Sequence, residues 1–291
     1  MLYNYFIENL INNEYYYYGD KMNCSVFSRI LSAKNNKVCI MGILNVTPDS
    51  FSDGGKFNCI TKALSHAEHM AEDGADIIDI GAVSTRPFAP SVSEAEEWER
   101  IKDVLKEIKK SCNVPVSIDT FNPYTAEKCL DMGADIINDV SGVFNPRMAD
   151  VIKKYNCGWV IMHGGVHVRK TEEYTEFADG IINDVNSFFC SMLDEISACG
   201  ISLSNICLDP GFGFSKNSQQ NTELLDNLEK IDKHDLPMLC ALSRKRFIGE
   251  LSGESEPEKR DAATLSANLK AISKGADIIR VHNVALHKEY I

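Results

Sequence analysis

From Lys37 onward, short apolar runs alternate with longer stretches in which apolar residues stand three and four positions apart. The short runs have the length of strands and the longer stretches have the period of helices, so the pattern predicts strands and helices in alternation. The expected strands cover residues 38–45, 76–80, 115–119, 135–139, 158–163, 205–209, 237–243 and 276–282. Helices are expected between them, for example over residues 60–73, 93–110 and 180–199.

Three of these strands begin with the same repeated segment. Gly-Ala-Asp-Ile-Ile occurs at residues 74–78, 133–137 and 275–279, each time after a helical stretch. The residues that follow the three copies differ from one copy to the next: Asp79 after the first, Asn138 and Asp139 after the second, Arg280 and His282 after the third. A scaffold that repeats while its strand ends vary indicates that the ends carry chemistry.

Turn signals mark the helix boundaries. Ser93 followed by Glu96 is the start of a capping box, and glycines stand where helices are expected to end, at Gly74, Gly133, Gly200 and Gly275. The strands read as continuous apolar runs, which is typical of parallel strands covered on both faces.

Eight strands alternating with helices are compatible with a closed (β/α)8 TIM barrel or with an open doubly wound sheet. A dinucleotide-binding sheet would carry GxGxxG after its first strand, and this chain has no such motif; Gly211-Phe212-Gly213 lacks the third glycine. Polar ends on all eight strands favour the barrel, where they meet on one rim. We therefore expect a single α/β domain over residues 37–291, preceded by an irregular and disordered Asn- and Tyr-rich extension over residues 1–36.

Composition narrows the class of protein. Hydrophobic residues make up 44% of the chain and charged residues 25%, as in ordinary globular proteins, and no run of about 18 apolar residues predicts a membrane span. The ten cysteines form no CxxC pair, and the first twenty residues contain no Lys or Arg, so they do not resemble a secretory signal. We expect reduced thiols in a cytoplasmic protein.

The formal net charge of −12 argues against a nucleic-acid or anionic membrane surface. An anionic substrate must then be held by a local basic cluster rather than by the overall charge.

The expected rim gathers two chemically different groups of residues. One offers acceptors, an amide and an ammonium donor, which suit a flat, nitrogen-rich heterocycle whose every buried edge needs a partner: Asp119, Asn138, Asp209 and Lys245. The other stands on the first and last strands, which are neighbours in a closed barrel, and suits phosphate oxygens that share a hard cation: Asn45, Arg280 and His282.

Each of these residues also has a purely structural interpretation. A single strand-end Asp can cap the following helix, and Asp79 is the best candidate for that role. Asn138 and Asp139 can close a turn, and Arg280 can belong to a structural ion pair. So many polar residues on one rim nevertheless favour a site.

Two segments after the first two strands are longer than a βα turn needs, at residues 45–55 and 84–90. Both combine turn-forming residues with an aromatic residue and charges, so they are predicted to close over a bound substrate.

With these residues in view, the chain resembles dihydropteroate synthases over about residues 38–284. The motifs that carry the resemblance are GILNVTPDSFSDGG at 42–55, STRP at 84–87, SIDT at 117–120, INDVSG at 137–142, LDPGFGF at 208–214, SRK at 243–245 and RVHNV at 280–284. The resemblance implies a (β/α)8 barrel that joins 6-hydroxymethyl-7,8-dihydropterin diphosphate to 4-aminobenzoate and releases diphosphate in folate biosynthesis. It also implies Mg²⁺ dependence, a homodimer and inhibition by sulfonamides.

Residue roles follow from the resemblance position by position. The pterin is expected at Asp119, Asn138, Asp209 and Lys245, and Mg²⁺ at Asn45. The diphosphate end is expected at Thr85, Arg280 and His282. The residues expected to frame the aminobenzoate are Phe51, Arg86, Pro87, Phe212 and Lys245. Among all of these, Lys245, Arg280, His282 and Asp119 are the expected catalytic residues.

Two alternatives stay open at this point. A methyltetrahydrofolate:corrinoid methyltransferase is a related pterin-binding barrel, but it needs neither a diphosphate clamp nor the SFSDGG segment, so Arg280, His282 and Lys245 favour the synthase. A catalytically silent barrel that binds pterin is the second alternative. Diphosphate release that depends on aminobenzoate distinguishes an enzyme from such a module.

Overall fold

The strands close into a barrel. The computed structural model describes residues 25–33, 38–47, 55–83, 92–164 and 174–291. Eight parallel strands pair in the order β6-β5-β4-β3-β2-β1-β8-β7, and a parallel bridge between Leu208 and Met238 joins the two ends of this order. The strands are β1 (Cys39–Asn45), β2 (Ile77–Gly81), β3 (Val116–Asp119), β4 (Ile136–Asp139), β5 (Gly158–Met162), β6 (Ile206–Asp209), β7 (Leu239–Cys240) and β8 (Ile278–Val281). The expected (β/α)8 barrel is confirmed, and the open sheet is excluded.

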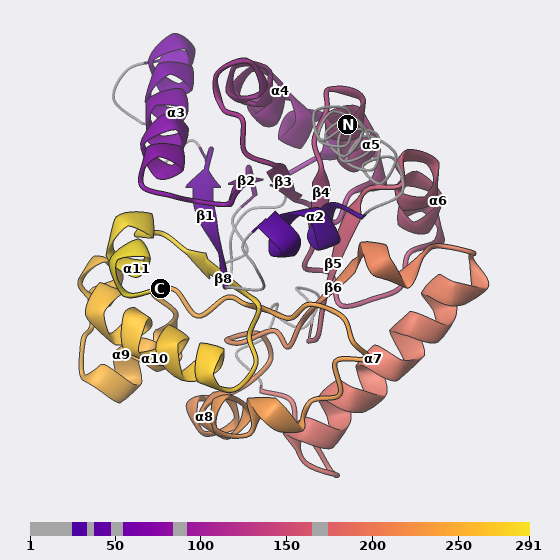
Figure 1. Ribbon diagram of the computed structural model, residues 1–291, viewed down its shortest axis with the longest axis vertical. Helices are drawn as coiled ribbons and strands as arrows, with labels where there is room; N and C mark the ends of the chain where they lie inside the picture. Colours follow the sequence, from indigo (N-terminus) through magenta and orange to yellow (C-terminus); the bar gives the residue numbers. More distant parts are fainter. Residues whose placement is uncertain (1–24, 34–37, 48–54, 84–91, 165–173) are drawn as a thin grey trace, which may run out of the picture.

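Helices surround this ring of strands (Figure 1). They are α3 (Gly55–Glu72), α4 (Glu94–Ser111), α5 (Pro123–Asp131), α6 (Pro146–Tyr155), α7 (Ile181–Ala198), α8 (Ser218–Asp226), α9 (Arg246–Ser252), α10 (Asp261–Ser273) and α11 (Val284–Tyr290), with short 3₁₀ turns η3 (Leu203–Asn205), η4 (Leu228–Lys230) and η5 (Pro257–Lys259). The predicted boundaries hold at α4, where the Ser93 side chain accepts a hydrogen bond from the Glu96 backbone N–H. The four predicted helix-ending glycines all have a positive φ, between 72° and 98°.

One expected strand is much shorter than predicted. The apolar run at 237–243 contributes only Leu239–Cys240 to the sheet. Beyond it the chain turns at Ser243 and Arg244, and α9 starts at Arg246. This turn lies at the carboxyl end of the barrel, where it affects the site described below.

The barrel interior is apolar toward the amino ends of the strands and polar toward their carboxyl ends. Side chains two residues apart on a strand face the same side. On the inward side, Ile77 is followed by Asp79, Ile136 by Asn138, Cys207 by Asp209 and Ile278 by Arg280. The first members of these pairs belong to the buried apolar cluster inside the barrel, and the second members form the polar layer toward the strands' carboxyl ends.

A further helix, α2 (Val26–Ala33), closes the apolar end of the barrel. It lies across the ring of strands in Figure 1, and its Val26, Phe27 and Ile30 belong to the interior cluster. Gly158 at the start of β5 lets it approach, because a side chain there would begin 2.6 Å from Val26 Cγ1. The expectation of an irregular conformation throughout 1–36 was therefore wrong for these eight residues, whose apolar positions are spaced as on one helix face. The division of the chain into an extension (1–36) and a barrel (37–291) stays a prediction.

Two of the compositional expectations can be compared with the described parts of the chain. Every cysteine for which the structure gives a state is a free thiol, and most of them are buried. No helix among the described residues has both the length and the apolar character needed to span a membrane.

Candidate active site

The strand registers bring the expected rim residues onto one level. Asn45 of β1 is paired with Gly81 of β2, Gly81 with Asp119 of β3, and Asp119 with Asn138 of β4. The sequence could not give this register, but it placed each polar residue at the end of its strand. Asp119 and Asn138, predicted for the ring, therefore lie at the same mouth as Asn45, predicted for Mg²⁺.

Arg280 ties this layer together from inside the barrel. Its Nε donates to Asp79 Oδ2 at 2.6 Å, and its Nη2 donates to Asp119 Oδ2 at 2.8 Å. Asn138 Nδ2 donates to the same Asp79 oxygen at 3.2 Å. Asp79 is completely buried, so the interpretation of Asp79 as a helix cap was wrong: its side chain points into the barrel because it lies two residues after the inward-facing Ile77.

Burial and neighbouring charges shift the pKa values of two side chains in this layer, Asp119 and Arg280. Burial, helped by the carboxylates of Asp79 and Glu97, raises the pKa of Asp119 to about 7, although Arg280 and Lys245 oppose the shift. Burial on its own lowers the pKa of Arg280, but Asp79 and Asp119 outweigh it and raise the pKa above its usual value. The guanidinium therefore stays charged, while Asp119 is able to exchange a proton near neutral pH.

Lys245 and Asp209 occupy the opposite side of the mouth. Asp209 Oδ1 accepts a hydrogen bond from the Gly211 backbone N–H at 2.7 Å, and burial raises the pKa of this carboxyl although Lys245 opposes the shift. Lys245 Nζ donates to the Phe212 carbonyl oxygen and lies 4.6 Å from the centre of the Phe214 ring. The ammonium is thus held over the loop that follows β6.

His282 follows β8 and is joined to the end of β7. Its Nδ1 lies 2.8 Å from Ser243 Oγ, which also accepts from the His282 backbone N–H at 3.2 Å. The two contacts fix the imidazole at the mouth, two residues after Arg280 in the sequence and on the side of β1 and β8 where the phosphate-binding group was expected.

Two buried acceptors in the polar layer have no hydrogen-bond partner among the described residues: Asp79 Oδ1 and Asn138 Oδ1. Buried oxygens of this kind cost free energy unless a donor reaches them. They therefore mark a place where a ligand rich in N–H groups is complementary to the protein.

The comparisons with known proteins point to the same chemistry. Residues 41–282 match the family described as "Pterin binding enzyme". The dihydropteroate synthase of Staphylococcus haemolyticus is 42% identical over 253 residues, which are 86% of this chain and 91% of that protein. The chain belongs to the dihydropteroate synthase family.

Solved structures of other dihydropteroate synthases share the fold. That of Xanthomonas albilineans with 4-aminobenzoic acid has a TM-score of 0.81 and 37% identity, and covers 87% of this chain and 90% of its own. The same enzyme in complex with 7,8-dihydropteroate has a TM-score of 0.78 and 35% identity, with the same two coverages. The resemblance noted in the sequence is thus confirmed over 87% of the chain.

The resemblance predicts Mg²⁺ at Asn45 of this chain, and an exposed side-chain amide oxygen of this kind can serve as a magnesium ligand. Asn45 is exposed at the end of β1, and a side chain at Gly81 would begin 3.7 Å from Asn45 Oδ1. No group of three or more His, Cys, Asp or Glu residues that could hold a metal exists in the described parts of the chain. Mg²⁺ commonly uses one or two protein oxygens, water and substrate phosphates rather than a full protein cage.

The remaining site residues predicted for this synthase are distributed unevenly. Phe212 is completely buried, and its ring stacks on Phe247 with centroids 6.1 Å apart, so its carbonyl rather than its ring faces Lys245. Phe51, Thr85, Arg86 and Pro87 lie outside the described residues.

Sequence reasoning missed Lys216 of the loop that follows β6. Its Nζ is buried and donates to the carbonyl oxygens of Gly211 and Phe214, at 2.9 and 3.2 Å. Burial lowers its pKa to about 7, although Asp209 and Asp184 oppose the shift. A neutral amine has two N–H bonds, which match these two carbonyls. The only signal in the sequence was a lone Lys within a Gly- and Phe-rich loop.

Proposed function

We propose that this chain carries out the family's reaction in the polar layer at the carboxyl end of the barrel. The reaction condenses 6-hydroxymethyl-7,8-dihydropterin diphosphate with 4-aminobenzoate to give 7,8-dihydropteroate and diphosphate, a step of folate biosynthesis. The observation that carries the location is the buried layer built on Arg280, whose acceptors Asp79 Oδ1 and Asn138 Oδ1 have no partner among the described residues.

The pterin ring is bound through hydrogen bonds with Asp119, Asn138, Asp209 and Lys245. A dihydropterin presents N–H donors and a carbonyl along one edge, and each must find a partner when the ring leaves water. Two carboxylates and an amide oxygen supply acceptors, and Lys245 supplies a donor. The buried, partly unsatisfied state of the layer supports this assignment, because the ring restores the missing hydrogen bonds.

The diphosphate lies on the side of His282 and Asn45, with Arg280 between the diphosphate and the ring; Thr85 is assigned to it from the sequence alone. Positive charge and N–H donors there stabilise the negative charge that grows on the leaving oxygen. When bound, Mg²⁺ at Asn45 supplies further charge neutralisation at the diphosphate oxygens. Arg280 is held by two carboxylates, so its position is fixed before substrate arrives.

The carbon–oxygen bond to diphosphate breaks, and its electron pair leaves with the diphosphate. The electron-rich dihydropterin spreads the resulting positive charge, and the ring-binding residues keep the reactive carbon in place. The amine of 4-aminobenzoate then forms the carbon–nitrogen bond and loses a proton. Since the amine is weakly basic, its positioning contributes more than a strong general base would.

The aminobenzoate is framed by Phe51, Arg86 and Pro87, and Lys245 stands between it and the ring. The first three remain assignments from the sequence alone. The carbonyl of Phe212, which holds Lys245, supports a role for this residue through its backbone. Two further features stay predictions: a homodimer, which the resemblance implies, and a cytoplasmic location, which the cysteine usage implies.

Diphosphate release by the purified chain tests the proposal. Release that requires 4-aminobenzoate, Mg²⁺ and the pterin diphosphate together, and that falls by about 10²-fold or more in Lys245→Ala and Arg280→Ala, supports the synthase. Pterin binding with no release supports the silent barrel instead. Methyl transfer from methyltetrahydrofolate, without diphosphate release, supports the methyltransferase.

A further inference from the structure

Arg244, between Ser243 and Lys245, has a backbone conformation that is unusual for its type. Its φ is 57°, in the left-handed region that side chains other than glycine seldom adopt. Such a residue keeps this conformation only if its surroundings hold it. Lys245 comes directly after it, so the direction of Lys245 depends on what holds Arg244.

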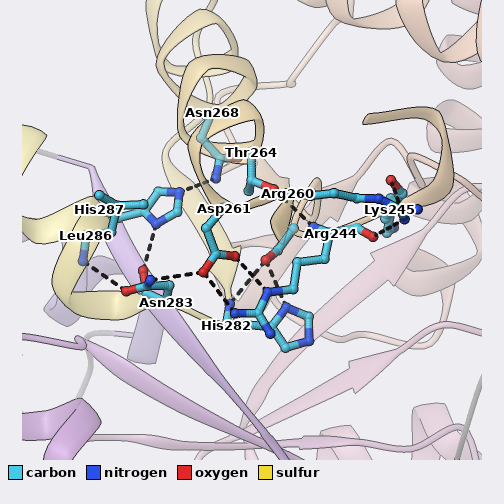
Figure 2. A network of polar contacts seen from close by, with 11 residues as sticks. Arg244, Lys245, Arg260, Asp261, Thr264, Asn268, His282, Asn283, Leu286 and His287 are labelled. Atoms are coloured by element: carbon cyan, nitrogen blue, oxygen red, sulfur yellow. Dashed lines mark hydrogen bonds and ion pairs between the residues drawn. The ribbon is translucent and has the colours of Figure 1, made fainter. Parts of the chain in front are cut away.

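The start of α10 holds Arg244 at three different groups (Figure 2). The backbone N–H of Arg244 donates to Thr264 Oγ1 at 3.1 Å. Its guanidinium makes a two-pronged ion pair with Asp261, at 2.7 and 2.9 Å. Its carbonyl oxygen accepts from Arg260 Nη1 at 3.0 Å. Three residues within one helical turn thus fix the donor, the side chain and the acceptor of a single residue.

Arg260 is itself built into the interior. Its guanidinium is largely buried and also donates to the carbonyl oxygens of Glu254 and Ser255. It crosses α9 at Gly249, where an added methyl group would lie 2.6 Å from Arg260 Cζ. The glycine inside α9 therefore leaves room for the guanidinium that holds the Arg244 carbonyl.

Asp261 extends the connection to the neighbouring strand end. Its Oδ2 accepts from Asn283 Nδ2 at 3.0 Å as well as from Arg244. Asn283 follows His282, and Ser243, which precedes Arg244, contacts the His282 ring. One carboxylate therefore links the segment that carries Lys245 to the segment that carries His282 (Figure 2).

The geometry points to Arg260, Asp261 and Thr264 as positioning residues that hold Arg244 in its left-handed conformation and so direct Lys245 into the substrate site. This inference rests on the proposed function, because it assigns Lys245 to the substrates. None of the three residues needs to touch a substrate: they act through Arg244 on the ammonium, and through Asn283 on the spacing between Lys245 and His282.

A matched pair of variants at Thr264 tests the inference. Thr264→Val keeps the buried volume but removes the oxygen that accepts from the Arg244 N–H, whereas Thr264→Ser keeps the oxygen. We expect kcat/KM for the pterin diphosphate to fall about 10- to 100-fold in Thr264→Val, the effect of a displaced group, and to change less than about 3-fold in Thr264→Ser. Rates are counted per folded active site, so that a loss of stability alone does not lower them.

The loss of kcat/KM in Thr264→Val must also depend on the presence of Lys245. In a Lys245→Ala background, Thr264→Val is expected to lower kcat/KM by less than about 2-fold further, because the group that it misdirects is already absent. Equal losses in both backgrounds would overturn the inference.

A second pair at Arg244 does not depend on whether Thr264→Val folds. Arg244→Gly and Arg244→Ala both lose the ion pair with Asp261, but only glycine adopts a φ of 57° without strain. We expect Arg244→Gly to keep at least about 5-fold higher kcat/KM than Arg244→Ala. Equal activity of the two would contradict a role for the backbone conformation.

A control separates this inference from the proposed function. Glu256→Gln removes an exposed ion pair with Lys259 close to the same helix and should leave kcat/KM unchanged. Absence of turnover in the unmodified chain would overturn the proposed function. Turnover in the unmodified chain that Thr264→Val leaves intact would overturn the positioning role alone.

Discussion

Asp79 and Arg280 are 201 residues apart in the chain, yet Arg280 Nε lies 2.6 Å from Asp79 Oδ2 inside the barrel. The pair connects β2 with β8 across β1, and Asn138 and Asp119 join it from β4 and β3. The Arg280 side chain therefore does not need to move in order to bind the diphosphate. It is a fixed charge around which the ring-binding residues are arranged.

Asp79→Asn tests this arrangement. The substitution keeps the shape but leaves Arg280 with one carboxylate in a buried site, and breaking a buried pair costs about 3–5 kcal/mol. We expect kcat/KM to fall by roughly 10²-fold together with a clear loss of stability in urea unfolding. The matched control is Asp226→Asn, which removes an exposed partner of Lys270 and should cost less than about 1 kcal/mol. Equal effects of the two substitutions would contradict the central role of the buried pair.

Binding of the pterin ring should strengthen as pH rises through about 7. Burial raises the pKa of Asp119 to about 7, and only the ionised carboxylate accepts the N–H donors of the ring at both oxygens. Between pH 6 and pH 8 the affinity for 7,8-dihydropterin, measured by calorimetry, is expected to increase about 10-fold. Asp119→Asn should bind weakly and without this pH dependence.

The same shift has a consequence for stability. Because the folded pKa lies above the ordinary value of 3.8, the folded protein keeps a proton that the unfolded chain releases between about pH 4 and pH 7. The stability contributed by this group is complete at low pH and is lost as pH rises through about 7. Unfolding of Asp119→Asn should lack this component.

The lowered pKa of Lys216 has the opposite effect on stability at higher pH. Burial lowers its folded pKa to about 7 from 10.5, so above pH 7 the unfolded chain binds a proton that the folded protein does not. Stability from this group therefore rises with pH between about 7 and 10.5. We compare the melting temperatures of the native protein and of Lys216→Met at pH 7 and at pH 9.5. The difference, native minus variant, is expected to be larger at pH 9.5. A constant difference would show that Lys216 is charged at both pH values.

Helix α2 should stabilise the barrel without contributing to chemistry. Phe27 is almost completely buried in the interior cluster, so Phe27→Ala is expected to cost about 3–5 kcal/mol in chemical unfolding. Arg29 on the same helix is exposed, and Arg29→Ala should change the free energy of unfolding by less than about 0.5 kcal/mol. Activity per folded molecule should stay the same in both; a loss in Phe27→Ala would connect this end of the barrel with the site.

The order of strands and helices could be predicted from the sequence because each element has a local signal of period, length and turn residues. The rim residues could be predicted for the same reason, since each follows an apolar strand. The partners of these residues could not, because the contacts join positions far apart in the chain. Asp79 has no local feature that distinguishes a helix cap from an ion-pair partner.

Glu97 shows the same limit. It lies in the first turn of α4, but it is buried and accepts hydrogen bonds from Asn122 Nδ2 at 2.6 Å and Thr125 Oγ1 at 2.7 Å. Its partners belong to the next helix, so neither its own helix nor the helix dipole reveals them. Helix α2 was missed because its eight residues are too few for a clear period.

A structure of the chain with a pterin diphosphate analogue bound is the most direct test of the central claim. The account predicts the ring between Asp119, Asn138, Asp209 and Lys245, with donors on Asp79 Oδ1 or Asn138 Oδ1 and the diphosphate beside His282 and Asn45. A ring bound elsewhere, with the Arg280 layer unchanged and empty of ligand, would contradict it.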